Sequence, residues 1–385
     1  MLGLFGKNKT RLIGLDIGHS SIKMIQMSRG SQTVRVEAAQ ERCLEPGLEQ
    51  GSEQRKAFIV DSISKMLREG KFSGRGVISC VPCDMLKIKS LRMDTAEPEE
   101  IEKLMRTEVA DRFGLDPASD EIRYIVAGNV YQGESIKNEI IFFGTAHKDL
   151  VEHLEMIEAA GLEPASIDTA PCALFRSFQM SLRRKEDKEI VSVLADLGSR
   201  FTTVIIGRGQ QIVFIKQIPL AGEQLTQDVA MRLGIGVPEA ALLRSKLRYP
   251  EDGTIDPETR SAVIEAMKPT IESLAREISL CFKYYAVTFR GQRPNEAVFA
   301  GGEAYEDTLM DALRNQLNVQ IRIAEPLRGF DLSGGHFERR RNPQLCEWAV
   351  VVGLGLKGWE LPEVSQTLQD EDVKETVAVE ETVTV

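Results

Sequence analysis

The sequence has no apolar run that approaches the roughly 20 residues needed to cross a lipid bilayer. Its first seven residues are too short for the apolar core of a signal peptide, and strand-like sequence begins soon after them. Basic residues are in the minority, since the net charge is −10 and the pI is about 5.2. This balance argues against a nucleic-acid partner, which would require a basic face, and against nonspecific attraction to anionic lipid.

Clustered metal ligands are also scarce. The six cysteines are scattered, and the lone Cys-x-x-Cys motif at Cys80 and Cys83 has no second pair of ligands at the spacing of a zinc site. This motif follows an apolar strand, whereas a thioredoxin-type motif would open a helix. The four histidines do not cluster. We therefore expect reduced, structural thiols in a cytoplasmic protein.

A short pattern occurs twice in the 385 residues, half a chain apart. In residues 14–23 an apolar strand ends at Asp16, Gly18 follows, and a second strand begins after a few small or polar residues. Residues 194–203 repeat this order with Asp196 and Gly198. Each copy predicts a β-hairpin with a glycine-bearing turn. The chain length also suggests two or more domains, each with its own core.

If the two turns faced each other, they could bind one anion between them. Glycine allows backbone N–H groups to approach phosphate oxygens, and the two carboxylates could hold a hydrated Mg²⁺. A third segment, residues 297–304, is an apolar strand that ends in the pair Gly301-Gly302. Such a strand end brings backbone close to a phosphate or a flat ligand.

In this order, the three segments resemble the phosphate 1, phosphate 2 and adenosine motifs of the superfamily that includes actin, heat-shock chaperones and sugar kinases. The resemblance implies an α/β fold of the actin-like, RNase H-like kind, which is a duplicated ATPase fold. It also implies ATP and Mg²⁺ as cofactors. Three unrelated hairpins or strand ends in an ordinary α/β protein are the alternative interpretation.

The resemblance gives roles to single residues. Asp16 and Asp196 would hold Mg²⁺ through water, although each could instead cap its turn. The other candidate nucleotide-binding residues lie on the two turns, on the third strand end, and on a helix resembling one that supplies a basic residue near the adenosine. They are Gly18, His19 (through its backbone), Ser20, Ser21, Lys23, Gly198, Ser199, Thr202, Arg244, Gly301 and Gly302. Lys23 could instead be a solvated strand lysine, and Arg244 a surface charge.

Segments between these motifs resemble the type IV pilus assembly family PilM, over about residues 1–360. They are residues 1–7, 80–82, 86–91, the acidic helix 98–113, 218–226, 274–285 and 350–358. The resemblance implies a cytoplasmic ATP-binding scaffold of the pilus inner-membrane assembly platform, peripheral to the membrane and in contact with other platform proteins. Its partner would be the cytoplasmic N-terminal peptide of a PilN-like bitopic membrane protein. The peptide groove is placed only by region, around residues 78–165.

The resemblance also predicts the domain organisation. Residues 85–165 form an inserted subdomain of the 1C type, which we interpret as helix, strand, strand, helix. Residues 221–290 form subdomain 2B, with two short helices at 222–249 and one long helix at 254–290. Subdomain 1A comprises residues 1–84 with 166–189 and 340–360, and subdomain 2A comprises residues 190–220 with 291–339. The acidic residues 361–385, which contain no aromatic residue, predict a disordered tail.

One departure from the superfamily pattern concerns hydrolysis. ATPases of this superfamily usually carry Glu or Gln in the first connecting helix, where it orients the attacking water. PilM-like sequences often have Glu-Pro there, whereas this chain has Ala170-Pro171. Alanine cannot polarise water, and Asp168 would point elsewhere. We therefore predict ATP binding with slow or negligible hydrolysis.

Two other functions fit the same fold. The chain could be an active ATPase or kinase, or a filament-forming division protein like FtsA. FtsA would end in a basic amphipathic membrane helix, whereas residues 361–385 are acidic. A sugar kinase would lack the small insert and would need a catalytic base, for which the sequence offers no clear candidate. The sequence does not distinguish a type IV pilus from a secretion system or competence machinery.

Overall fold

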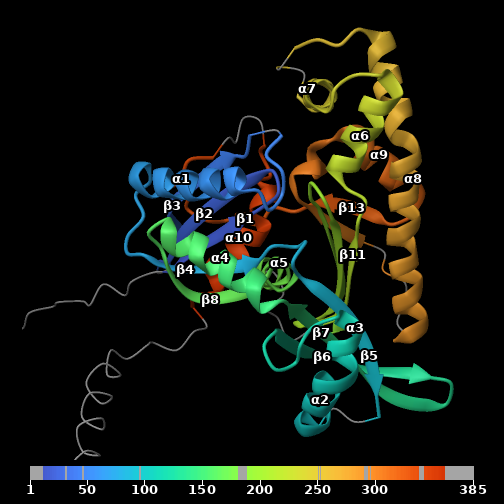
Figure 1. The fold of residues 1–385 in the computed structure, drawn as a ribbon. Coiled ribbons are helices and arrows are strands. Elements are labelled where there is room, and N and C mark those ends of the chain that lie inside the picture. The colour runs from blue at the N-terminus through green and yellow to red at the C-terminus, as the bar shows by residue number, and fades with distance from the viewer. Residues whose placement is uncertain are drawn as a thin grey trace, which may run out of the picture.

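The computed structural model describes residues 12–30, 33–45, 47–94, 97–180, 189–249, 251, 253–289, 294, 296–337 and 342–359. The opening residues 1–7, the basic run 339–341 and the acidic segment 361–385 lie outside the described residues. Within these ranges the chain forms two α/β halves, one beside the other in Figure 1, with a smaller insert below them.

The N-terminal half is built on a five-stranded sheet with the order β3-β2-β1-β4-β8. Strands β1 to β3 form the antiparallel meander that the turn signals predict, and β4 and β8 continue the sheet in parallel. Side chains of β2 alternate between two cores, because helices cover both faces of the sheet. The strands are β1 (Ile13–Ile17), β2 (Ser21–Arg29), β3 (Val34–Cys43), β4 (Gly76–Val81) and β8 (Glu163–Thr169).

The C-terminal half repeats this sheet. Its order is β11-β10-β9-β12-β13, with the same sequence of two antiparallel and two parallel pairings. The duplicated α/β architecture that the paired motifs predict is therefore confirmed. The strands are β9 (Val191–Leu197), β10 (Thr202–Arg208), β11 (Gln211–Ile218), β12 (Glu296–Ala300) and β13 (Gln320–Ile323).

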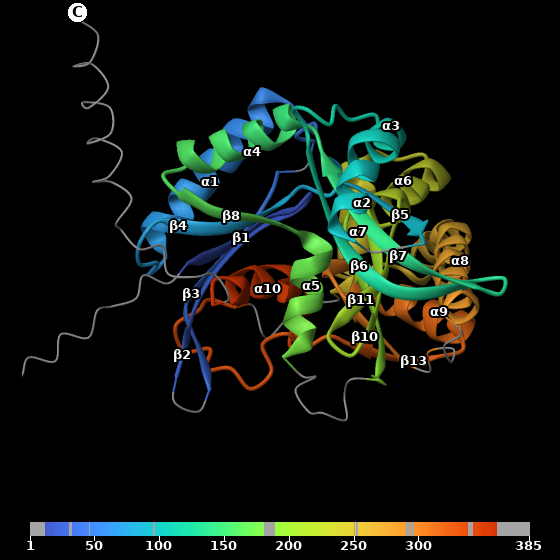
Figure 2. The same ribbon diagram turned by 90° about the horizontal axis from the view of Figure 1, so that it is seen from below.

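Two short helices, α5 (Ala170–Gln179) and α10 (Ala349–Lys357), lie between the two sheets, as Figure 2 shows. They cross at very close range, since a Cβ added to Gly353 would overlap the carbonyl oxygen of Ala173. A second close approach joins α10 to the first sheet, where a Cβ on Gly14 would lie 2.7 Å from the Gly355 nitrogen. The glycines of this apolar helix thus permit the close packing that the sequence predicts.

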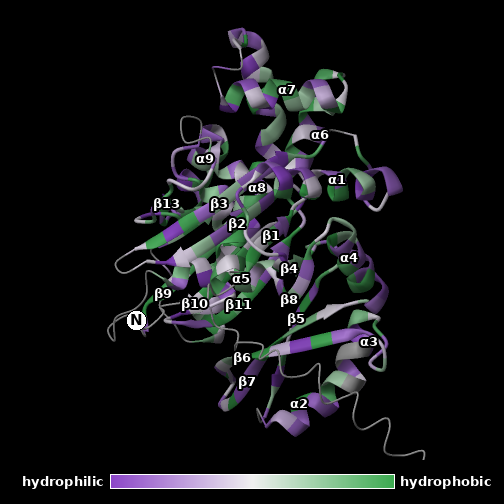
Figure 3. Cartoon of the chain, turned by 90° about the vertical axis from the view of Figure 1, so that its left-hand side faces the viewer, coloured by the Kyte–Doolittle hydropathy of each residue, from purple (hydrophilic) through white to green (hydrophobic). Residues whose placement is uncertain are grey.

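The outer helices of the C-terminal half are α6 (Gly222–Leu233), α7 (Val237–Arg248), α8 (Pro257–Thr288) and α9 (Asp307–Leu317). Helix α8 begins at Asp256, whose carboxylate accepts from the Thr259 N–H, and it continues through Pro269 for 32 residues. Its buried stripe packs with α6 and α9 in one core together with the inner faces of β9 and β12. Figure 3 shows the apolar residues of both halves concentrated on the central strands.

The insert is a three-stranded sheet with the order β5-β7-β6 and one helical segment. Its strands are β5 (Lys87–Met93), β6 (Glu121–Gln132) and β7 (Ser135–Thr145). The helical segment runs through α2 (Pro98–Leu104), a π-helical turn η1 (Met105–Val109) and α3 (Ala110–Phe113). Strand β6 extends to Gln132, which pairs with Ser135 of β7.

Two elements differ from the helix, strand, strand, helix pattern that the sequence suggested for the insert. Residues 87–93 form a third strand, which pairs with β7. Helix α4 (His147–Ala159), assigned to the insert from sequence, instead packs with α1 (Glu53–Glu69) on the first sheet. Ile157 belongs to the same core as Ile59 and Ile63. Periodicity reveals an apolar helix face, but it does not reveal which surface that face covers.

Candidate functional site

A cavity of about 720 Å³ opens between the two halves, at the ends of β1, β9 and β12. This volume is typical of small-molecule sites, which occupy roughly 300–1,000 Å³. Both motif aspartates and all three glycine-bearing segments face it, so the two hairpins share one cleft. The expected site residues that line the cavity are Asp16, Gly18, His19, Ser20, Ser21, Lys23, Asp196, Gly198, Ser199, Gly301 and Gly302.

The two hairpin turns are built in the same way. In the first turn the Gly18 N–H donates to the Ser21 carbonyl at 2.9 Å, and in the second the Gly198 N–H donates to the Phe201 carbonyl at 3.2 Å. A Cβ on either glycine would lie 2.9 Å from that carbonyl oxygen. Any other residue at these positions would therefore force the turn to shift.

Thr202 lies outside the cavity lining, contrary to its expected contact with phosphate. Its side chain is buried and donates to the Leu220 carbonyl at 2.7 Å. Asp16 pairs with Lys23 across the first hairpin, and Asp196 pairs with Thr203 across the second. Thr203 lines the cavity. The expected phosphate contact was assigned one residue too early, to Thr202 and not to Thr203. Neighbouring residues of a strand point to opposite faces of the sheet, so this shift changes which side chain faces the cavity. Aligning the two repeats position by position would have identified Thr203.

The third segment brings backbone directly against the second aspartate. Gly301 has φ of +90°, a conformation that favours glycine. A Cβ at this position would overlap the Leu197 carbonyl oxygen and lie 2.5 Å from Oδ1 of Asp196. Only a glycine can therefore close this wall of the cavity while leaving Asp196 in place.

The two aspartates share a buried and mutually repulsive environment. Burial raises the pKa of Asp196 to about 6, and the charge of Asp16 adds to this rise. Burial also raises the pKa of Asp16, but there the neighbouring Lys23 opposes it more strongly. The site therefore carries negative charge that its own cations do not fully balance at neutral pH.

Lys23 is the buried cation nearest to these carboxylates. Its ammonium lies 3.0 Å from Oε1 of Glu41 and donates to the Ser21 hydroxyl at 2.5 Å. Burial lowers the pKa of Lys23, but Glu41 and Asp16 together outweigh burial and raise it. Lys23 is thus a charged group in the cavity wall, and the solvated strand lysine considered as an alternative does not describe it.

This arrangement fits a hydrated divalent cation. Mg²⁺ binds through one or two carboxylates and completes its coordination with water and phosphate oxygens. Burial raises the pKa of Asp16 and of Asp196, and a bound cation would offset the cost of keeping both buried groups charged. Among the residues that the structure describes, no group of three or more His, Cys, Asp or Glu has the arrangement of an all-protein metal site. Water and phosphate would therefore supply most of the ligands.

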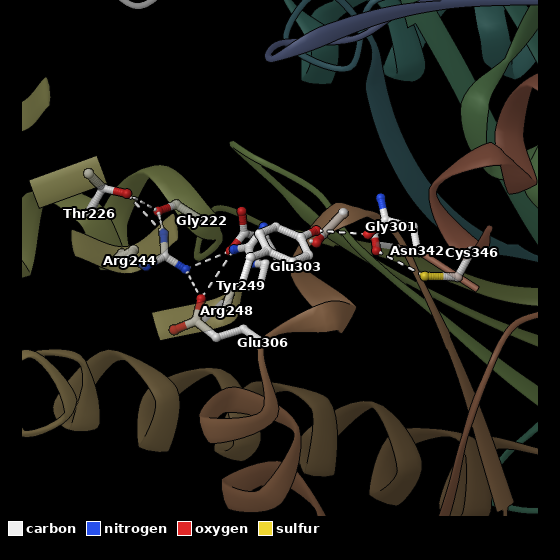
Figure 4. A network of polar contacts seen from close by, with 11 residues as sticks. Gly222, Thr226, Arg244, Arg248, Tyr249, Gly301, Glu303, Glu306, Asn342 and Cys346 are labelled. Atoms are coloured by element: carbon white, nitrogen blue, oxygen red, sulfur yellow. Dashed lines mark hydrogen bonds and ion pairs between the residues drawn. The ribbon is translucent and has the colours of Figure 1, made fainter. Parts of the chain in front are cut away.

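Arg244 was expected near the adenosine, but it lies outside the cavity lining and is 4% exposed. Its guanidinium donates to the Gly222 carbonyl at 2.6 Å and to Oε2 of Glu303 at 2.6 Å, and it also pairs with Glu306 (Figure 4). The surface charge considered as an alternative is equally inconsistent with this burial. The arginine instead joins α7 to the segment that follows Gly302.

Arg248, one helical turn further along α7, does line the cavity. Its guanidinium donates to Oε2 of Glu303 at 2.6 Å and to the Gly302 carbonyl at 3.1 Å. The network in Figure 4 therefore holds Arg248 against the third glycine segment. Sequence reasoning missed this residue, although its i+4 spacing from Arg244 places both on one helix face.

Charged residues link the two halves at the cavity mouth. The His19 ring lies 3.7 Å from Glu223, and Arg200 reaches Asp84 at 3.5 Å and Glu223 at 3.4 Å. The His19 carbonyl accepts from Arg55 at 2.8 Å. Burial, followed by the charge of Arg55, lowers the pKa of His19. Its ring is therefore mostly neutral near pH 7, and its bond to Glu223 is correspondingly weak.

Cys80 and Cys83 also line the cavity, which the sequence did not predict. Both are free thiols, as expected, and Cys80 Sγ lies 4.0 Å from Oδ1 of Asp16. Burial raises the pKa of Cys83 to about 12, with further contributions from Asp196 and Asp16. The two sulfurs are therefore uncharged and add apolar surface beside the carboxylates.

Ala170, at the start of α5, also faces the cavity. The neighbouring Asp168 is directed away, because its carboxylate binds Arg176 at 2.8 Å and Lys357 at 3.4 Å. The prediction that Asp168 points elsewhere is confirmed.

A family model described as type IV pilus assembly protein PilM matches residues 14–359. The chain belongs to the PilM family. Among solved structures, it is similar to a PilM-PilN type IV pilus biogenesis complex, with a TM-score of 0.74 and 21% identity over 90% of this chain and 98% of that one. It also shares the fold of the ethanolamine utilization protein EutJ from Carboxydothermus hydrogenoformans, with a TM-score of 0.54 and 13% identity over 90% of each chain.

Curated relatives include two cell division proteins named FtsA. The Bacillus subtilis protein is 24% identical over 199 residues, which are 47% of this chain and 44% of that protein. The Streptococcus pneumoniae protein is 19% identical over 348 residues, or 81% of this chain and 75% of that protein. The chain thus spans less than half of the first relative and three quarters of the second. In the part of the chain that the structure describes, no helix is both long and apolar enough for a membrane crossing.

Proposed function

We propose that this protein is a cytoplasmic ATP-binding scaffold of a type IV pilus or related secretion platform. It would reach the inner membrane only through partners, chief among them the cytoplasmic N-terminal peptide of a PilN-like membrane protein. The proposed ATP binding rests on one observation: Asp16 and Asp196 lie in one cavity with the glycines of both hairpin turns. Family membership and the similar PilM-PilN complex support the partner.

In this proposal the nucleotide lies across the cavity with its phosphates between the two turns. Backbone N–H groups near Gly18 and Gly198 and the hydroxyl of Thr203 would face phosphate oxygens, and Lys23 would offset their charge. Asp16 and Asp196 would hold Mg²⁺ through water. When bound, the ion would neutralise the phosphates beside these carboxylates.

The nucleoside would occupy the wall formed by the third glycine segment and α7. Gly301 and Gly302 allow backbone to approach the ligand there, and Arg248 stands beside them. Arg244 would contribute indirectly, since it fixes Glu303, which in turn binds Arg248. We keep the boundaries 1–84, 85–165, 190–220 and 221–290 as proposed subdomains, except that α4 is grouped with the first sheet.

Calorimetry of Mg-ATP binding tests the nucleotide site. Asp196→Asn should weaken Mg-ATP affinity by about tenfold or more, or about 1.4 kcal/mol, because it removes a carboxylate that holds the ion. The same variant should bind ATP in EDTA at least as well as the wild type, since it removes a negative charge. The exposed Asp311→Asn on α9 is the matched control. Equal Mg-ATP affinity in D196N and wild type would contradict the proposed site.

Peptide calorimetry tests the partner independently. A synthetic N-terminal segment of a PilN-like protein, taken from the neighbouring gene, should bind the full chain, whereas a scrambled peptide should not. No heat at high micromolar peptide would count against the scaffold, even if ATP binds normally. We place the groove only within residues 78–165.

A phosphate-release assay distinguishes the scaffold from an active enzyme. The wild type should turn over Mg-ATP slowly or not measurably, because Ala170 faces the cavity where a water-orienting side chain is needed. Ala170→Glu should raise the rate. Brisk release by the wild type that disappears in Asp196→Ala would favour an ATPase or kinase, and ATP-dependent pelleting would favour a filament.

A further inference from the structure

A second large cavity lies on the opposite side of α5 and α10 from the first. Its volume is about 930 Å³, and its wall includes Leu174 and Phe178 of α5 and Met180, which follows that helix. The other walls come from the tip of the β2–β3 hairpin, the ends of β12 and β13, and the loop 324–330. Figure 2 shows α5 and α10 between that hairpin and the second sheet. We call this cavity the lower cleft.

Arginines outnumber acidic residues among the side chains that line the lower cleft. Four arginines line it, namely Arg29, Arg176, Arg322 and Arg328, against one acidic residue, Glu325. Arg29, Arg322 and Arg328 are exposed, and the side chain of Arg328 retains 79% of its accessible surface. Arg176 is engaged with Asp168, Arg322 with Glu296, and Arg328 with Glu325 at 3.7 Å in an exposed ion pair. A basic cleft in a chain with a net charge of −10 indicates an acidic occupant.

The apolar walls of the lower cleft indicate that this occupant also carries apolar side chains. Phe330, Leu356 and Trp359 contribute ring and aliphatic surface beside the arginines. The Arg29 guanidinium lies over the Trp359 ring, 4.7 Å from its centroid. A small inorganic anion would leave most of this surface exposed to water, whereas a peptide with alternating acidic and apolar residues would cover both kinds of group.

Such a peptide follows Trp359 directly in the sequence. Residues 360–385 contain eight acidic residues and one lysine, interspersed with leucine and valine. Trp359 is itself part of the cleft wall, so this segment is tethered at the rim. A short tether gives an effective concentration in the millimolar range, which favours an intramolecular contact over a free competitor. Asp370 is the eleventh residue after Trp359, within a reach of at most roughly 36–40 Å when the chain is extended.

We propose that the acidic segment 360–385 binds in the lower cleft of its own chain. Its carboxylates face Arg29, Arg322 and Arg328, and its apolar side chains pack against the aromatic wall. The cleft is thereby closed to acidic segments of other proteins until a competitor displaces the tethered one. This proposal is independent of the nucleotide site and of the peptide partner.

Zero-length carbodiimide coupling in the full chain tests the contact. Arg328→Lys places a reactive amine at the exposed edge of the cleft with little change in charge. Dilute R328K protein should yield a coupled product between position 328 and a carboxylate at 370–372, identified by peptide mass spectrometry. The pair Lys56 and Glu152, 3.1 Å apart, serves as an internal control for the reaction. Coupling of that pair without any product at position 328 would overturn the proposal.

Two sets of variants, each removing three negative charges, separate specific binding from general electrostatics. D370N/E371Q/D372N should make amides in residues 322–330 exchange several-fold faster, which is the informative readout. In the R328K background the same changes remove the reactive carboxylates, so loss of the coupled product only confirms which carboxylates form it. E99Q/E100Q/E102Q removes the same charge from exposed positions on α2 and should change neither result. Equal effects from both sets would overturn the proposal. So would coupled products that join isotopically labelled to unlabelled chains, because they would identify a second copy as the occupant.

Discussion

The two hairpins that border the cavity between the halves have the same backbone arrangement but different charges. Both place an aspartate two residues before a glycine, with the same hydrogen bond closing each turn. Across the hairpin, however, Asp16 faces Lys23, whereas Asp196 faces Thr203. The first half therefore compensates its carboxylate internally, and the second half does not. This difference explains why burial raises the pKa of Asp196 to about 6, while Lys23 limits the rise at Asp16.

The two halves therefore differ in how much negative charge their aspartates retain at the cavity. A duplicated fold supplies two equivalent positions for a carboxylate, and the sequence then sets how much charge each one retains. In the first half, Lys23 partly offsets the charge of Asp16 before any ligand arrives. The half with the threonine keeps an uncompensated charge that a bound cation would relieve, at some expense to the stability of the empty protein.

Removing Lys23 should have the largest effect on this comparison. Lys23→Met would leave Asp16 and Glu41 without their buried cation, and we expect a loss of about 3 kcal/mol in unfolding free energy at pH 7.5. Urea denaturation measures this loss, which should shrink at pH 5 as Asp196 becomes protonated. The exposed pair of Lys65 and Asp61 provides a control, since Lys65→Met should cost less than about 0.5 kcal/mol. Equal losses in the two variants would show that Lys23 does not balance the site.

Neutralising each aspartate should then reveal the asymmetry. The folded-state pKa of Asp196 is raised to about 6 from 3.8, so this group costs stability as pH rises through that window. The full cost above pH 6 is up to about 3 kcal/mol. Asp196→Asn should therefore be more stable than the wild type at pH 7.5 and similar to it below pH 4.

Asp16→Asn should gain less at pH 7.5 than Asp196→Asn, because it also removes the partner of Lys23. Urea titrations of both variants across pH 4–8, without nucleotide or Mg²⁺, make the comparison. A larger gain in D16N than in D196N would reverse the proposed assignment of charge to the two halves.

The smallest effects should come from the adjacent threonines of the second hairpin. Thr202→Val removes the hydrogen bond to the Leu220 carbonyl and should cost about 1 kcal/mol of stability without changing Mg-ATP affinity. Thr203→Val should change stability little and weaken Mg-ATP binding by a few fold. Thermal unfolding and calorimetry on the two variants measure these effects. Weaker Mg-ATP binding in T202V and lower stability in T203V would show that Thr202, and not Thr203, faces the cavity.

The sequence predicted most of the fold because its signals are local and repeated. The order of strand, Asp16, glycine turn and strand occurs twice, and each copy specifies its own hairpin. The shared cavity then follows from the duplicated sheet order. Helix α4 was placed wrongly because an apolar helix face does not indicate which surface it packs against. Its partner Ile63 lies more than 80 residues away in the sequence.

The candidate site was less predictable at single residues. Thr202 was mistaken for a lining residue because both faces of β10 are buried, so alternation of polar and apolar residues gives no guide to direction. Arg248 was missed because its place depends on a buried network with Glu303, a contact between segments 55 residues apart. Cys80 and Cys83 line the cavity because β4 lies beside β1 in the sheet. No local sequence pattern indicates this pairing.

Helices α5 and α10 cross in direct backbone contact at Ala173 and Gly353. Backbone meets backbone there, so neither helix can move closer to the other. Both helices contribute to the wall of the cavity between the two halves and to the wall of the lower cleft. We therefore expect any larger side chain at position 353 to force the two helices apart and to disturb both cavity walls at once.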